Sequence, residues 1–187
     1  MPYIKLWDGE PLDPTSDKIL QETINRWDKA PNIVRALALN KDVLIGEDYW
    51  TEYLMKKGKL TRNFKEAIAT TVSAANKCLY CTSAHAWAME LTGTSSENTE
   101  ACTLFTFDGF EPKEKIALEF ARKATVNSKS ITSDDVNRLK EFYSDGEIVE
   151  ISAVIMAYMG YNTFVEILGL EVDAWVDRGL KTKWNSE

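Results

Sequence analysis

The sequence of 187 residues has little positive charge and no long apolar run. Its 22 Lys and Arg residues are outnumbered by 29 Asp and Glu residues, which gives a net charge of −7 and a pI near 4.9. This acidic balance argues against binding to nucleic acid or to an anionic membrane surface. The longest nearly apolar segment, residues 151–161, is far shorter than the roughly 20 residues that cross a bilayer, so it indicates a buried helix. We expect neither nucleic acid nor a membrane as partner.

Cysteine and histidine are also scarce, with three cysteines and one histidine. The N-terminus lacks the basic and apolar segments of a signal peptide, so we expect a cytoplasmic protein. An odd number of cysteines in that reducing compartment is not typical of a disulfide framework. A chain of this length also buries enough surface to fold without disulfides or metals. The close pair Cys78 and Cys81 therefore indicates redox or metal chemistry.

Apolar residues recur at intervals of three and four throughout, and no segment alternates as a β-strand would. We therefore predict an all-α fold in a single domain over residues 1–187. Its parts are an N-terminal helical layer (1–58), a central segment with the cysteine pair (61–92) and C-terminal helices (95–187).

Capping residues mark the expected starts of several helices, at Asp13, Thr61 and Thr132. The helix expected over residues 147–168 has almost no polar face. Such a helix lies at the centre of the molecule, at a subunit interface, or both.

The residues with the clearest chemistry are Cys78-Leu79-Tyr80-Cys81 and the single histidine, His85. Residues four apart on a helix share a face, so the imidazole of His85 can reach the sulfur of Cys81. A helix N-terminus and a nearby imidazole both favour the thiolate. Cys81 has that position if the helix begins near Cys78. We therefore predict a nucleophile and its base.

An effective base also needs a partner that orients it, and Glu66 in the preceding helix is the candidate. Antiparallel packing of the two helices would return Glu66 to His85, directly or through a water. Spacing alone favours another interpretation, a solvated face that Glu66 shares with Thr70, Ser73 and Lys77. The apolar face of the same segment is expected to comprise Ile68, Val72, Ala75 and Leu79.

Glu66, eleven further residues and then Cys78-x-x-Cys81-x-x-x-His85 resemble the redox signature of one protein family. It is the alkylhydroperoxidase D-like (AhpD-like) branch of the carboxymuconolactone decarboxylase family. The size and the N-terminal layer are similar to its peroxidase-related subgroup. The resemblance implies an all-α homo-oligomer, a trimer or hexamer, with thiol peroxidase activity and no metal, haem or other cofactor.

The resemblance also implies roles for the four residues. Cys81 would attack the peroxide, Cys78 would resolve the product, and His85 with Glu66 would relay protons. The substrate would be hydrogen peroxide or an organic hydroperoxide, and an external dithiol would be the reductant. The best-known members carry a second histidine where this chain has Tyr80. The decarboxylase members lack the cysteine pair, which argues against lactone chemistry here.

Other interpretations of the cysteines stay open. The pair could serve a protein disulfide oxidoreductase or a redox-sensing module. Cys78, Cys81, His85 and Cys102 could form a structural zinc site, although no second cysteine pair is present. Cys102 fits a packed helical thiol better. Four large side chains near this segment are more typical of a core than of a hydroperoxide pocket, namely Trp87, Met89, Tyr158 and Met159.

Overall fold

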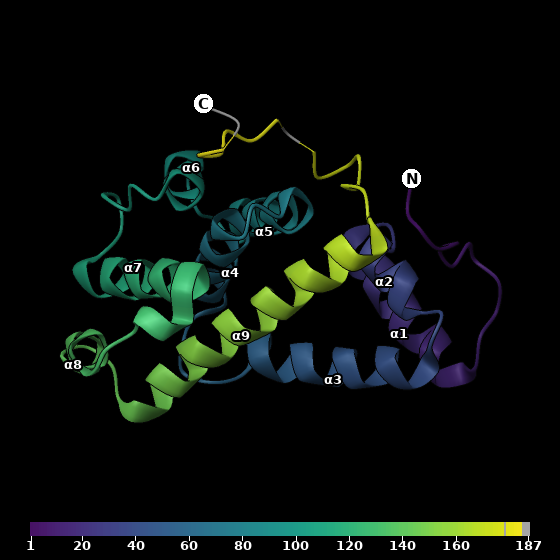
Figure 1. Cartoon of the computed structure of the whole chain (residues 1–187). Helices are drawn as coiled ribbons and strands as arrows, with labels where there is room; N and C mark the ends of the chain where they lie inside the picture. The colour runs from purple at the N-terminus through teal and green to yellow at the C-terminus, as the bar shows by residue number, and fades with distance from the viewer. Residues whose placement is uncertain (178, 185–187) are drawn as a thin grey trace.

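The structure is a computed structural model that describes residues 1–177 and 179–184, and this part of the chain contains helices and no strand (Figure 1). The all-α prediction is confirmed. The α-helices are α1 (Pro14–Trp27), α2 (Asn32–Leu37), α3 (Lys41–Lys56), α4 (Arg62–Ala75), α5 (Leu79–Leu91), α6 (Ser96–Leu104), α7 (Pro112–Asn127), α8 (Ser133–Lys140) and α9 (Asp145–Leu168). A short 3-10 helix, Ser128–Ser130, follows α7.

The capping residues of the sequence act as expected. The Asp13 carboxylate accepts hydrogen bonds from the first backbone N–H groups of α1. The hydroxyl of Thr61 accepts one from the N–H of Phe64 in α4. Thr132 forms a reciprocal capping box with Asp135 at the start of α8. These side chains satisfy N–H groups that have no partner within the helix, and so they fix where α1, α4 and α8 begin.

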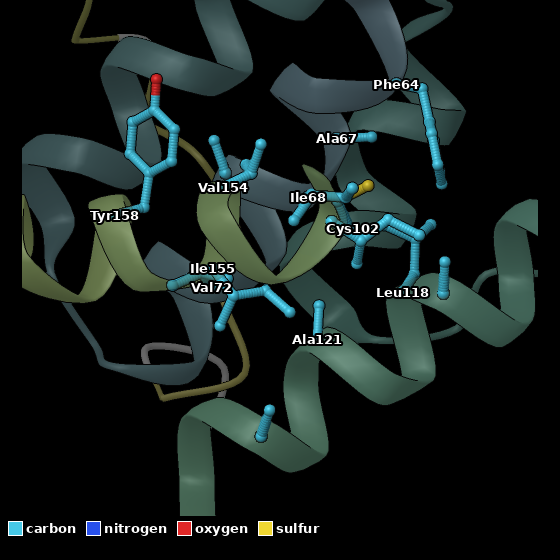
Figure 2. Close-up of a cluster of buried hydrophobic side chains, with 14 of the residues drawn as sticks. Phe64, Ala67, Ile68, Val72, Cys102, Leu118, Ala121, Val154, Ile155 and Tyr158 are labelled. Carbon is cyan, nitrogen blue, oxygen red and sulfur yellow. The ribbon is translucent and has the colours of Figure 1, made fainter. Parts of the chain in front are cut away.

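Helix α4 lies at the centre of the molecule, in contact with α3, α5, α6, α7 and α9. Every residue from 64 to 74 is buried. Figure 2 shows part of the core that α4 forms with its neighbours. The packed side chains include Phe64, Ala67, Ile68 and Val72 of α4, Cys102 of α6, Leu118 and Ala121 of α7, and Val154, Ile155 and Tyr158 of α9.

The predicted solvated face of this segment is wrong within α4, because neighbouring helices surround this helix. Lys77, which lies beyond the end of α4, is exposed as predicted. Glu66, Thr70 and Ser73 are fully buried. The Thr70 hydroxyl donates to the Glu66 carbonyl at 2.8 Å, and the Ser73 hydroxyl donates to the side-chain oxygen of Asn162 at 3.1 Å. Internal hydrogen bonds thus replace the water that these groups lose.

The predicted apolar face is also wrong at its end, because the helix does not continue to Leu79. Helix α4 stops at Ala75, and Lys77 adopts a left-handed backbone conformation with φ 60°. Leu79 is the first residue of α5, and 48% of its surface is exposed. The break turns the chain so that α5 packs back against α4.

Helix α9 runs across the molecule and packs against α3, α4, α5, α7 and α8 (Figure 1). Its inner face includes Ile151, Val154 and Ile155 in the core, which confirms the predicted central position. Among the described residues, α9 alone has the length and apolar composition to cross a membrane. Its outer face leaves a stripe of large apolar side chains exposed, Val149, Met156 and Ile167.

We expect Gly58→Ala to destabilise the fold. Gly58 follows α3 with φ +94°, and an added Cβ would lie 2.1 Å from Oε1 of Glu150. The Glu150 carboxylate cannot easily move aside, because it accepts from the N–H of Lys59 and pairs with the buried Lys65. A loss of about 2 kcal/mol in unfolding free energy is expected from the strained backbone and the clash.

Urea unfolding measures this effect, with Gly46→Ala as the control. Gly46 lies on the exposed side of α3, and an added Cβ meets no atom within 4 Å. Alanine is the better helix former, so this variant should be as stable as the wild type or more so. Equal stability of the Gly58 and Gly46 variants would contradict the prediction.

Candidate active site

Helix α5 begins next to the cysteine pair. Cys78 is the N-cap residue, and its sulfur accepts a hydrogen bond from the backbone N–H of Cys81 at 3.4 Å. The Cys78 carbonyl accepts from the N–H of Thr82, which starts the helical pattern. Both cysteines are free thiols, with exposed fractions of 1% for Cys78 and 3% for Cys81. The pair is therefore recessed in the protein.

The environment of the pair shifts the pKa values of its two thiols in opposite directions. A hydrogen bond from the Cys81 thiol and the N–H groups at the start of α5 lower the pKa of Cys78, although burial opposes this. The same hydrogen bond and burial raise the pKa of Cys81 well above its usual range. As the N-cap residue, Cys78 accepts an N–H hydrogen bond of the kind that favours a thiolate at the start of a helix.

The structure brings Glu66 of α4 and His85 of α5 into direct contact. Oε2 of Glu66 lies 2.7 Å from Nδ1 of His85. A carboxylate at Nδ1 favours the tautomer in which Nδ1 carries the proton and Nε2 is the free base. Tyr158 of α9 packs edge-on against the imidazole, with ring centroids 4.3 Å apart. The histidine is therefore held in both tautomer and orientation.

Arg62 holds the other oxygen of this carboxylate. Its Nε donates to Oε1 of Glu66 at 2.6 Å, from one turn earlier on α4. Burial alone would raise the pKa of Glu66, but the hydrogen bond from His85 and the Arg62 guanidinium lower it below its usual value. Glu66 is therefore a buried carboxylate that remains ionised between two partners.

Tyr80, the residue before Cys81, connects three segments of the fold. Its hydroxyl donates to Oδ2 of Asp173 at 2.8 Å and accepts from the N–H of Ile33 at 3.0 Å. Asp173 also accepts from the N–H of Asn32. Tyr80 thus ties α5 to the start of α2 and to the segment after α9.

A cavity of about 230 Å³ opens beside these residues, lined by α1 to α5, α9 and the segment after α9. Its wall includes Cys81, His85 and Glu66, but not Cys78. Trp87 and Tyr158 line it as well. Tyr158 is also part of the buried core, as expected, whereas Trp87 is half-buried and belongs to the cavity wall. Met89 is fully buried in the core, and Met159 packs against the core.

The described part of the chain contains no group of three His, Cys, Asp or Glu side chains placed to hold a metal ion. Cys102, the third sulfur of the zinc hypothesis, is fully buried in the core on α6. Burial raises the pKa of its thiol to about 12. The interpretation of Cys102 as a packed helical thiol is confirmed.

Several residues at this site were not singled out from the sequence. Arg62 could have been, because a cation four residues before a carboxylate is a known helical pairing. Trp27, Trp175 and Asp173 gave no such signal, since they lie far along the chain from Cys81. Only the folded arrangement brings them to one cavity.

Comparison with known proteins finds similarity in both sequence and fold. Residues 48–123 match the model of the carboxymuconolactone decarboxylase family. An uncharacterised peroxidase-related protein from Silicibacter sp. TM1040 has a similar structure, with a TM-score of 0.87, 23% identity and 96% of each chain covered. A second peroxidase-related protein, from Ralstonia eutropha JMP134 and described as an alkylhydroperoxidase AhpD core, has a TM-score of 0.85, with 23% identity and 94% coverage of each chain.

The fold also occurs in an enzyme with another reaction. A debrominase in complex with 2,3,4-tribromopyrrole has a TM-score of 0.79 and 20% identity, covering 94% of this chain and 96% of its own. The fold alone does not determine the reaction, so the function must be argued from the site. The chain thus contains a segment that matches the carboxymuconolactone decarboxylase family, and it has the fold of AhpD-like, peroxidase-related proteins.

Proposed function

We propose that the protein is a thiol peroxidase that reduces hydroperoxides at Cys81. One observation carries this proposal: Cys81 and the His85–Glu66 pair line the same cavity. A thiol with an oriented imidazole is the arrangement that nucleophilic attack requires. The peroxidase-related proteins of the same fold support an antioxidant role.

In the first step, the Cys81 sulfur attacks the terminal oxygen of the hydroperoxide, and the O–O bond breaks. The sulfur gains that oxygen and becomes a sulfenic acid, while the other oxygen leaves as an alcohol or as water. The leaving oxygen needs a proton, and the thiol must lose one. His85 transfers this proton through Nε2, and Glu66 stabilises the imidazolium that forms.

In the second step, the Cys78 sulfur attacks the sulfenic acid of Cys81. A disulfide forms and a water molecule leaves, so that the two thiols have supplied the two electrons of the reduction. An external dithiol then reduces this disulfide by thiol exchange. The cytoplasm, where such dithiols are kept reduced, suits this cycle.

Access to the cavity favours Cys81 as the attacking thiol, although the thiolate is favoured on Cys78. A hydroperoxide in the cavity can reach Cys81, whereas Cys78 is not part of the wall. The proton between the two sulfurs can move without any movement of heavy atoms. Which sulfur carries the proton in the resting protein therefore says less about the attacking thiol than which sulfur faces the cavity.

The recessed pair argues against exchange with protein disulfides. A protein substrate needs a sulfur at the surface, and both cysteines are buried. A small dithiol that enters the cavity fits better. A redox-sensing module, the other alternative for this pair, would need only one oxidation of the two cysteines per chain, without turnover.

Turnover with an excess of dithiol tests the proposed function. We expect the protein to consume many equivalents of hydroperoxide per chain while dithiol is present. Consumption of a single equivalent, followed by a stable disulfide, would contradict a peroxidase and support a sensor. No reaction with any hydroperoxide would exclude both.

The pH dependence of the rate of hydroperoxide turnover should change in the Arg62→Met variant. Loss of the guanidinium removes one cause of the lowered pKa of Glu66, so this carboxylate takes up a proton at higher pH. We therefore expect the rate to fall, on acidification, at a higher pH than in the wild type. Arg138→Met at the surface of α8 makes the same change in charge and should leave the profile unchanged. Identical profiles for all three proteins would contradict the role of Arg62.

We further propose that the protein is a homo-oligomer, a trimer or hexamer, that covers the exposed stripe of α9. Ile155 is core, so Met156, with 61% of its surface exposed, is the better position to test. Met156→Asp should yield smaller species in light scattering, because a charge would be buried without a partner. Asn137→Asp, at an exposed position of α8 away from this stripe, gives a control for charge alone. A monomeric wild type at micromolar concentration would contradict the proposal.

A further inference from the structure

Three tryptophans from distant parts of the chain meet at the cavity. Trp27 ends α1, Trp87 lies on α5, and Trp175 belongs to the segment after α9. The ring centroids of Trp27 and Trp87 are 5.0 Å apart, and those of Trp87 and Trp175 are 4.9 Å apart. The three rings form one continuous aromatic wall, and all three line the cavity that contains Cys81.

The part of α5 beside this wall carries two small side chains. Cys81, Ala84, His85 and Ala88 fall on one face of the helix, at intervals of three and four, and all four line the cavity. The two alanines place only methyl groups next to the reactive residues. Space therefore remains between His85 and the tryptophans.

Hydrogen peroxide would fill only part of the cavity. A water molecule occupies roughly 30 Å³, and hydrogen peroxide is only about twice as large. The cavity of about 230 Å³ is several times larger. It is also smaller than the roughly 300–1,000 Å³ of sites for drug-sized ligands. A single substituted ring has an intermediate size.

The charge of the lining disfavours an anionic ligand. Five carboxyl side chains face three cationic ones around the cavity: Glu47, Asp48, Glu52, Glu66 and Asp173 against Arg26, Lys56 and Arg62. Glu52 pairs with Lys56, and Arg62 with Glu66. Burial and the neighbouring carboxylates Glu22 and Glu52 raise the pKa of Asp48, as expected in a negative potential.

From the aromatic wall, the free space beside it and the charge of the lining, we infer that the cavity selects an uncharged hydroperoxide that carries an aromatic ring. The ring would lie against Trp27, Trp87 and Trp175. The inference rests on the proposed function, since it names the substrate class of the same site. Aromatic rings in contact contribute beyond the apolar area that they bury. The ring would thus hold the peroxide group toward Cys81.

A matched pair of substrates tests the inference. Cumene hydroperoxide and tert-butyl hydroperoxide are both tertiary, and they differ by a phenyl group in place of a methyl group. We expect kcat/KM to be at least about tenfold higher for cumene hydroperoxide, the scale of one or two aromatic contacts. The analogue with a cyclohexyl ring should lie in between, because it has the bulk without the π system. A ratio near one would overturn the inference.

Variants of the wall should change this ratio. Trp175 lies outside the helices, and Trp175→Leu should lower the ratio of the two kcat/KM values by about three- to tenfold. Ala88→Leu fills the space beside the wall and should lower it as well, without removing a tryptophan. Trp50→Leu on the outer side of α3, which does not line the cavity, should change neither rate. An unchanged ratio in both wall variants would contradict the role of the tryptophans.

Binding without chemistry separates this inference from the proposed function. In the Cys81→Ser variant, 2-phenyl-2-propanol should shift the indole N–H signals of wall tryptophans in NMR spectra, and tert-butanol at equal concentration should not. Saturable shifts without any peroxidase activity in the wild type would support the aromatic site and reject the peroxidase. Peroxidase activity without such shifts would reject the aromatic site alone.

Discussion

Cys81→Ser is expected to abolish hydroperoxide turnover. The serine hydroxyl is a far weaker nucleophile than a thiol, and no other cysteine lines the cavity. The fold should tolerate the change, because oxygen and sulfur differ little in size. Peroxide consumption in the presence of excess dithiol provides the measurement. Cys102→Ala serves as the control, since this core thiol should not take part in the reaction.

The Cys78→Ser variant distinguishes the roles of the two sulfurs. In Cys78→Ser, Cys81 should be oxidised once and then remain as a sulfenic acid or a mixed disulfide, because the resolving thiol is absent. A sulfenic-acid reagent followed by mass spectrometry identifies the modified residue. Equal labelling of Cys78 in the Cys81→Ser protein would reverse the assignment. The lowered pKa of Cys78 makes this control essential.

His85→Ala should lower the peroxidase rate by about 10² to 10⁴, the usual contribution of a positioned general acid or base. The imidazole is partly exposed in the cavity, with 20% of its side chain accessible, so the loss of stability should be small. Stopped-flow oxidation of the reduced protein measures the step directly. Thermal unfolding of the same variant checks the fold. An unchanged rate would show that His85 is a packing residue.

Glu66→Gln should act in the same direction with a smaller effect. Glutamine can still accept from Nδ1 of His85, but it does not stabilise the imidazolium as a carboxylate does. It also leaves the Arg62 guanidinium without its charged partner. A rate equal to that of the wild type would argue that Glu66 only supports the fold.

Much of the fold could be predicted from the sequence, because local signals fix the helices. Asp13, Thr61 and Thr132 cap helices where their side chains predicted it. The periodicity could not show that α4 has no solvated face. Thr70 and Ser73 are fully buried because helices from much later in the chain cover them. Periodicity describes one helix, whereas burial depends on all its neighbours.

The site could be predicted where its residues are close in sequence. The spacing of Cys81 and His85 on one helix was enough to group them, and the resemblance added Glu66. The cavity could not be predicted, since Trp27 and Trp175 meet only in the folded protein. The position of the thiolate depends on the angle at which the chain enters α5. A hydrogen bond from the N–H of Cys81 to the sulfur of Cys78 cannot be inferred from spacing.

Two of the three wall tryptophans come from other parts of the chain than the reactive residues do. Glu66, both cysteines and His85 lie within residues 48–123, the part that matches the family. Trp27 and Trp175 lie outside it. Substitutions at the two ends of the chain can therefore reshape what the cavity admits while the reactive residues stay the same.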